Sequence, residues 1–138
     1  MTGTYEHSLD DKGRLVIPSR LRDELGSVFY LAPGVKSNLT VYPMEAWTVL
    51  QERAAALPTT QAAAMDVFFA SCCRCEPDKQ WRIQLPTNLK AYANIDHDVV
   101  TTGNNDRAQI WSAEAWAEKT RSELTPANIA NILDTLGI

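Results

Sequence analysis

One sequence motif occurs twice in the chain, and this duplication constrains its fold more than any other feature. The stretch "SLDDKGRLVIP" at 8–18 resembles "EPDKQWRIQLP" at 76–86. The similarity continues beyond both stretches with a single extra residue in the second copy. So many ordered matches with one gap indicate an internal duplication. The halves are expected at 1–71 and 72–138. The aligned pairs include Asp10 with Asp78, Arg14 with Arg82, Pro18 with Pro86, Leu21 with Leu89, Gly34 with Gly103, and Trp47 with Trp116.

Each half predicts the same series of short elements. Two strands flank the turn "DDKG", where Gly13 adopts positive φ at low cost. A short helix follows and ends at Gly26, and two more strands complete the half. This order predicts an α+β fold with a mostly β core. The expected elements are strands at 5–9, 14–17, 28–31 and 39–42 and a helix at 19–25 in the first half, with strands at 98–102 and 108–111 in the second.

Further helices follow the strands of each half. An apolar face predicts one helix through Leu57, with "LPTT" starting another that runs to about Ser71. Ser112 is placed to cap a third helix, and Thr125 before Pro126 starts a fourth. These faces must be buried on the chain's own sheet or on a neighbouring subunit, and the sequence leaves both open. The two stripes are Trp47, Leu50, Ala54 and Leu57, and Ile129, Ile132, Leu133 and Leu136.

Length and composition set limits on the class of protein. A chain of 138 residues that is 45% apolar can bury a real core, as one domain or as two small halves that share it. No apolar run approaches the roughly 20 residues of a membrane helix, and the acidic N-terminus does not read as a signal peptide. Three clustered cysteines fit a reducing compartment. We therefore expect a cytoplasmic protein with no membrane partner.

Basic charge is concentrated in the repeated phrases. The formal net charge is −4, which taken globally argues against nucleic acid. Residues 10–22 and 78–90, however, carry seven basic against three acidic side chains, a net +4, so the remaining 112 residues carry −8. Phosphate binding responds to local potential. The alternative is a solvated surface on which lysines and arginines fall by accident.

At the start of a strand, the residues of the D-x-x-x-R motif can form a turn and orient a side chain for binding. The aspartate can accept turn N–H groups and orient the arginine, whose planar fork can bind phosphate or read guanine O6 and N7. A purely structural ion pair on the surface is the other interpretation, and the two are compatible.

Signals for catalysis or metal binding are weak. The segment "CCRC" with His7 or His97 could suggest zinc, but it holds no C-x-x-C pair, so buried or half-buried free thiols at Cys72, Cys73 and Cys75 are favoured. Neither a nucleophile elbow, a Walker loop nor a dinucleotide fingerprint occurs. We expect no enzyme activity, no metal, no cofactor and no small-molecule substrate.

Five stretches together resemble the MraZ family of bacterial proteins: "LDDKGRLVIPSRLRDELG", "YPMEAW", "LPTTQAA", "PDKQWRIQLP" and "IWSAEAW". The resemblance covers nearly the whole chain. It implies two AbrB-like swapped-hairpin halves that form a pseudo-symmetric barrel with flanking helices. It also implies a nucleoid-associated transcriptional regulator, expected to repress, that assembles into a homo-oligomeric ring. Such a ring binds direct repeats of double-stranded DNA in the promoter of the division and cell-wall gene cluster.

The same resemblance implies which residues contact DNA. They are Asp10, Lys12 and Arg14 in the first copy and Asp78, Lys79 and Arg82 in the second, with Arg20, Arg22 and Lys90 as possible additional basic contacts. The alternative function is an antitoxin-like or scaffold protein whose main partner is another protein.

One position departs from the family pattern. Trp81 stands where the second motif usually has glycine, and an L-residue at positive φ costs about 1–2 kcal/mol. We therefore expect this turn to be reshaped. An exposed tryptophan at this place could pack on a sugar or base of the DNA, or it could fold back over the barrel and shield Arg82. The first copy, with more basic residues, is expected to dominate DNA contact.

Overall fold

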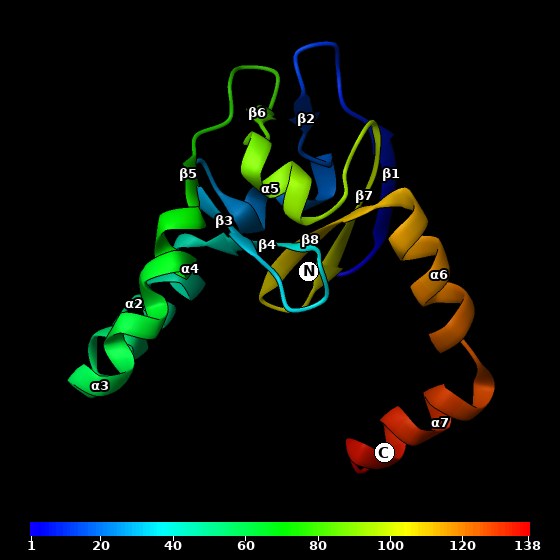
Figure 1. Ribbon diagram of the computed structural model, residues 1–138. Helices are drawn as coiled ribbons and strands as arrows, with labels where there is room; N and C mark the ends of the chain where they lie inside the picture. Colours follow the sequence, from blue (N-terminus) through cyan, green and yellow to red (C-terminus); the bar gives the residue numbers. More distant parts are fainter.

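The computed structural model describes all residues from 1 to 138 and holds two sheets. The larger sheet has six antiparallel strands in the order β1-β7-β8-β4-β3-β5, and β2 pairs with β6 in a separate two-stranded ribbon (Figure 1). The mostly β core predicted from the duplication is therefore confirmed. The strands are β1 (Thr4–Ser8), β2 (Arg14–Val16), β3 (Phe29–Pro33), β4 (Leu39–Pro43), β5 (Cys73–Cys75), β6 (Arg82–Gln84), β7 (Asp98–Asn104) and β8 (Arg107–Ser112).

The two copies exchange their first strands. β1 of the first copy pairs with β7 of the second, and β5 of the second copy pairs with β3 of the first. β1 and β2 flank the turn at 10–13, as predicted, but they do not pair with each other. The alternating sequence pattern predicts the strands correctly, but burial in the shared core determines which strand each one pairs with. β1 and β5 remain as the two edges of the large sheet, so its hydrogen bonds do not close a barrel.

One core lies between the ribbon and the large sheet. Leu15 of β2 and Ile83 of β6 face each other and are almost fully buried. They join a cluster of 18 buried residues drawn from both copies. Because each copy supplies part of one core, the two halves are expected to unfold together.

Helices occupy both sides of the large sheet. They are η1 (Ser19–Leu21), α1 (Arg22–Leu25), α2 (Met44–Ala55), α3 (Thr59–Ala62), η2 (Ala63–Met65), α4 (Asp66–Ser71), α5 (Thr87–Tyr92), α6 (Ala113–Glu123) and α7 (Pro126–Thr135). The predicted caps are confirmed, because Ser112 accepts from the N–H of Ala115 and Thr125 accepts from that of Asn128. Gly26 ends α1 with a φ of 76°. No helix combines the length and the apolar character that crossing a membrane requires.

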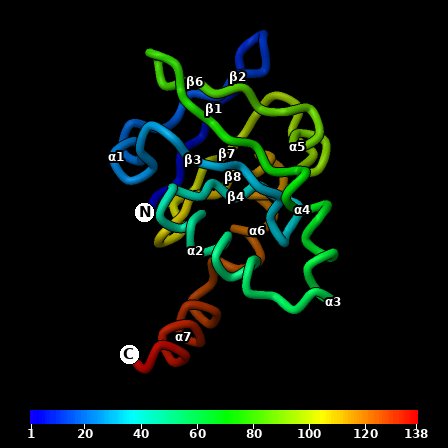
Figure 2. The backbone as a smooth tube through the Cα atoms, turned by 90° about the vertical axis from the view of Figure 1, so that its left-hand side faces the viewer, coloured from blue at the N-terminus to red at the C-terminus, as the bar shows by residue number.

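Aromatic side chains attach the helices to the sheet face away from the ribbon. Trp47 of α2 stacks on Tyr30 of β3 with ring centroids 4.1 Å apart, and Phe69 of α4 meets Trp47 edge-on. In the second copy, Trp116 of α6 packs on Trp111 of β8. These tryptophans therefore serve packing within the chain. The helices form two separate arms, α2–α4 on one side and α6–α7 on the other, and both point away from the ribbon (Figures 1 and 2).

Candidate nucleic-acid interface

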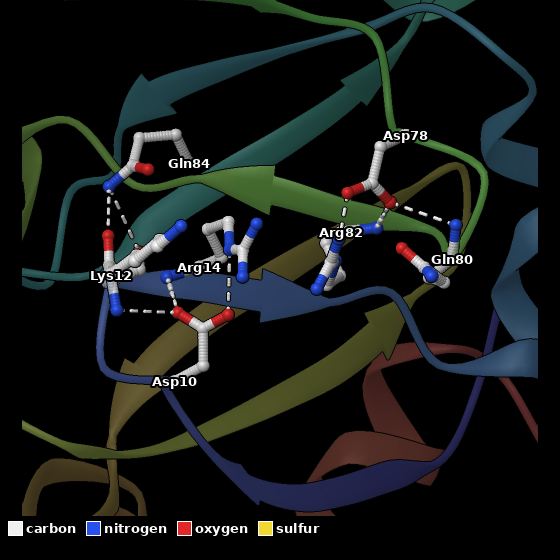
Figure 3. A network of polar contacts seen from close by, with 8 residues as sticks. Asp10, Lys12, Arg14, Asp78, Gln80, Arg82 and Gln84 are labelled. Carbon is white, nitrogen blue, oxygen red and sulfur yellow. Dashed lines mark hydrogen bonds and ion pairs between the residues drawn. The ribbon is translucent and has the colours of Figure 1, made fainter.

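The first D-x-x-x-R motif forms a tight turn at the start of β2. Asp10 Oδ1 accepts hydrogen bonds from the backbone N–H groups of Lys12 and Arg14, each 2.9 Å long. The Nε of Arg14 donates to Asp10 Oδ2 at 2.7 Å (Figure 3). The backbone closes the turn, since Gly13 donates to the carbonyl of Asp10 and takes a φ of 73°. One carboxylate thus fixes both the turn and the direction of its arginine.

The second motif repeats this geometry nearly bond for bond. Asp78 Oδ1 accepts from the N–H groups of Gln80 and Arg82 at 2.9 Å each, and the Nε of Arg82 donates to Asp78 Oδ2 at 2.8 Å. Trp81 takes the place of Gly13 with a φ of 60°. The expectation that tryptophan reshapes this turn was therefore wrong. The fold meets the cost of positive φ because the same hydrogen bonds and the packing of the indole hold the turn in place.

Trp81 is half-buried, whereas the sequence suggested an exposed side chain. Its ring packs against the buried core, and the guanidinium carbon of Arg22 lies 5.4 Å from the ring centroid. Of the two orientations open from sequence, the ring folds back over the core. It does not project from the turn as an outward aromatic.

Both arginines keep their terminal nitrogens available. Arg14 and Arg82 use Nε for their aspartates, and neither donates from an Nη atom to any group of the chain. Each side chain is 28% exposed. The turn N–H bonds and the paired guanidinium lower the pKa of Asp10 and, in the same way, that of Asp78. These carboxylates therefore stay charged at neutral pH, and two forks of oriented donors face outward.

The register of the ribbon places the two arginines close together. Arg14 lies opposite Gln84, and Arg82 lies opposite Val16. Arg14 and Arg82 are therefore diagonal neighbours, about 7–8 Å apart by the usual geometry of such pairs. With Leu15 and Ile83 turned into the core, the outward face of the ribbon carries Arg14, Val16, Arg82 and Gln84.

Two of the other basic candidates each lie at the turn of the opposite copy. Arg22 of the first copy lies at the turn of the second through its contact with Trp81. Lys90 of the second copy lies at the turn of the first, with its Nζ 3.8 Å from where a Cβ on Gly13 would stand. Lys12, Lys79 and Arg20 are exposed, the first two on the turns and the third on η1.

Sequence reasoning did not select Gln84. Its Nε2 donates to the carbonyl of Lys12 at 2.7 Å, so a residue of the second copy braces the turn of the first (Figure 3). The equivalent position in the first copy is Val16, which cannot make this bond. The aligned difference between glutamine and valine was the available signal, but it has meaning only once β2 and β6 are known to pair.

The three cysteines form no cluster with other ligands. Cys75 is buried, and Cys72 and Cys73 are half-buried free thiols. Burial raises the pKa of Cys72 to about 11 and that of Cys75 to about 12, with the neighbouring Cys73 adding to both shifts. The structure contains no group of three or more His, Cys, Asp or Glu side chains arranged to hold a metal ion.

Two aligned copies that exchange strands and present matched Asp–Arg turns on one ribbon define a duplicated, strand-swapped protein. Comparison with known proteins agrees with the duplication. The family model described as "MraZ protein, putative antitoxin-like" matches the chain twice, at residues 1–70 and 68–135. The chain belongs to the MraZ family.

Several curated relatives match over most of their length. A protein of Desulfitobacterium hafniense is 44% identical over 140 residues, covering 99% of this chain and 98% of its own. One of Moorella thermoacetica is 44% identical over 122 residues, covering 86% and 85%, and one of Clostridium beijerinckii is 40% identical over 139 residues, covering 99% and 98%. Each of the three is named "Transcriptional regulator MraZ".

Proposed function

We propose that this chain is a sequence-specific DNA-binding transcriptional regulator and that the outward face of the β2–β6 ribbon contacts the DNA. One observation carries the proposal: two matched turns orient Arg14 and Arg82 side by side with free Nη atoms. The names of the relatives support the class of function. The ribbon is the surface to which we assign this function.

The chemistry of the ribbon fits duplex DNA. A two-stranded β-ribbon can enter the major groove, where an arginine fork binds guanine O6 and N7. Nε is held by the aspartate, so each arginine reaches the groove with its orientation already set, which lowers the entropy lost on binding. Residues flanking the ribbon supply charge for phosphates on either side of the groove. They are Lys12, Arg20, Arg22, Lys79 and Lys90.

The finer parts of the proposal concern target and assembly. One ribbon is smaller than a single DNA-binding module, which buries roughly 600–1,000 Å². A homo-oligomeric ring would place many ribbons along one duplex, and avidity would then multiply modest affinities. Direct repeats would match subunits that repeat in one orientation. We propose the promoter of the division and cell-wall gene cluster as the target, repression as the outcome, and a cytoplasmic, nucleoid-associated location.

A second function has one observation in its favour. The family model carries the description "putative antitoxin-like", and the acidic remainder of the chain, at a net −8 outside the two repeated segments, would tolerate a basic protein partner. A gene for a small toxin beside this gene would favour that function. A cell-wall and division cluster in that place would favour DNA binding.

A mobility-shift titration tests the DNA-binding proposal. The chain is titrated against its own upstream DNA and against a scrambled duplex of equal composition, between about 50 and 200 mM salt, a range over which phosphate-dominated binding weakens steeply. We expect tighter binding to the upstream DNA and a steep loss with salt. Equal affinity for both duplexes would contradict sequence-specific binding. An affinity that does not change with salt concentration would contradict contact with phosphates.

A further inference from the structure

The backbone of the β2–β6 ribbon has twofold pseudosymmetry. Leu15 pairs with Ile83 at the centre of the ribbon, and these two residues hold equivalent positions in the two aligned copies. Rotation by half a turn about this pair therefore exchanges β2 with β6. The rotation places Arg14 on Arg82, so the two outward arginines obey the symmetry.

Val16 and Gln84 break this symmetry. They also hold equivalent positions in the two copies, and they lie on the outward face, Val16 opposite Arg82 and Gln84 opposite Arg14. One side chain is apolar and the other is an amide. Valine favours strands, but β6 forms the same strand with glutamine at this position, so strand formation does not account for Val16.

Val16 is an apolar side chain among polar neighbours. It is 44% exposed, and the ribbon stands at the end of the molecule opposite the helical arms (Figure 1). Its methyl groups are therefore in contact with water in the free chain. Burying them against an apolar group of a partner would be favourable.

Gln84 offers a different group at the equivalent place. Its Nε2 donates to the carbonyl of Lys12 at 2.7 Å, and no group of the chain donates to its Oε1 (Figure 3). The hydrogen-bond acceptor is therefore the part of Gln84 that remains available to a partner. The two copies thus present an apolar group at one position and an acceptor at the other.

We propose that Val16 contacts the 5-methyl group of a thymine in the major groove and that the difference between Val16 and Gln84 gives the ribbon one direction on the duplex. This inference rests on the DNA contact of the proposed function and extends it to a particular base. Among the four bases, thymine alone presents a methyl group in the major groove, and apolar side chains recognise it. Oε1 of Gln84 accepts instead from the amino group of an adenine or a cytosine.

The thymine lies close to the guanine that Arg82 contacts. Directly opposite residues of an antiparallel pair have Cβ atoms about 4.5–5.5 Å apart, and Val16 is directly opposite Arg82. Successive base pairs are about 3.4 Å apart along the duplex. Val16 therefore reaches a base pair one or two steps from that guanine.

A single direction on the duplex suits direct repeats. A protein surface with full twofold symmetry matches a palindromic site, because it presents the same groups to both strands. The symmetric pair Arg14 and Arg82 alone would leave two opposite orientations equivalent. The unequal pair Val16 and Gln84 distinguishes them at the base edges, where sequence is recognised.

Uracil in place of thymine tests the methyl contact, because uracil lacks the 5-methyl group and keeps the hydrogen-bonding groups of thymine. The upstream DNA and a scrambled duplex are each prepared with thymine and with uracil. The full chain is titrated against all four by fluorescence anisotropy. We expect wild type to bind the thymine form of the upstream DNA at least about fourfold more tightly than the uracil form, the effect of one buried methyl group.

Three variants assign this effect to Val16. Val16→Gln places in β2 the residue that β6 already accepts, and we expect it to bind the thymine and uracil forms equally. Val16→Thr keeps one γ-methyl group and should show a reduced effect. Val35→Gln is the matched control, since Val35 is 98% exposed on the loop between β3 and β4, and it should retain the wild-type effect. Circular dichroism checks the folding of each variant.

Uracil placed in one strand at a time tests the direction. Because one copy alone supplies the valine, we expect the effect that depends on Val16 to come from one strand of the upstream DNA. Equal effects from the two strands would overturn the single direction. Specific binding by wild type with equal affinity for thymine and uracil DNA would overturn the methyl contact but not the DNA-binding proposal, as would a full uracil effect in folded Val16→Gln. Equal affinity of wild type for upstream and scrambled DNA would overturn both.

Discussion

Arg22 of the first copy lies over the indole of Trp81 in the second, with its guanidinium carbon 5.4 Å from the ring centroid. The same guanidinium group donates from Nε to the carbonyl of Ile17 at 3.0 Å. Lys90 of the second copy takes the matching place beside Gly13 of the first. A basic side chain on the helix of each copy therefore lies at the turn of the other copy. The two copies exchange one basic residue each.

The matching geometry of the two turns changes the expected ranking of the two arginines. Unequal contributions were expected because the first segment has more basic residues and the second has a bulky turn. The structure removes the second reason, since the turns match in geometry, whereas the exchange of Arg22 for Lys90 leaves the number of basic residues at each turn unchanged. We now expect Arg14→Ala and Arg82→Ala each to weaken binding to upstream DNA by about 1–3 kcal/mol if they read bases, with the two losses within a factor of a few.

Fluorescence anisotropy with labelled upstream DNA measures both losses. Arg14→Lys and Arg82→Lys serve as the partner series, because lysine keeps the charge but not the planar fork. A loss confined to one arginine would restore the unequal interpretation. Full rescue by lysine would assign the arginines to phosphate contact in place of base reading.

Trp81→Gly should lower stability without loss of fold or binding. Glycine relieves the cost of positive φ, about 1–2 kcal/mol. The loss of a half-buried indole costs more, because full removal of a buried tryptophan costs about 3–5 kcal/mol. We expect a net loss of about 1 kcal/mol in urea unfolding and DNA affinity that is unchanged or improved. Abolished binding by a folded Trp81→Gly protein would make Trp81 a contact residue.

The carboxylates of the two turns give a defined pH dependence. The folded-state pKa of Asp10 and of Asp78 lies below the ordinary value near 3.8. Their contribution to stability is therefore fully present above that value and is lost as the pH falls through the folded pKa. NMR carboxyl titration should find both groups below 3.8. An unshifted midpoint for either would show that its turn does not hold in solution.

Cysteine alkylation tests the burial of the thiols. With pKa values raised to about 11 and 12, Cys72 and Cys75 carry little thiolate at pH 7.5. We expect iodoacetamide to modify them far more slowly in the native chain than in urea, as followed by mass spectrometry. Equal native and denatured rates would place these thiols at the surface.

Local chemistry could be predicted from the sequence, but long-range pairing could not. The turn at Asp10 and the caps at Ser112 and Thr125 follow from residue types and spacing, and the structure confirms them. The pairing of β2 with β6 does not follow, because alternation in "RLV" fits any partner that buries Leu15. Trp81 was misjudged for the same reason: its positive φ could be anticipated, but the support from Arg22 depends on the exchange between copies.

Binding of the chain to its own upstream DNA, before and after loss of both outward arginines, tests the central claim most directly. The Arg14→Ala, Arg82→Ala double variant is compared with wild type and with Arg121→Ala, which removes an exposed arginine on α6 far from the ribbon. We predict that the double variant, folded by circular dichroism, loses specific binding while Arg121→Ala retains it. Wild-type affinity in the folded double variant would contradict the account.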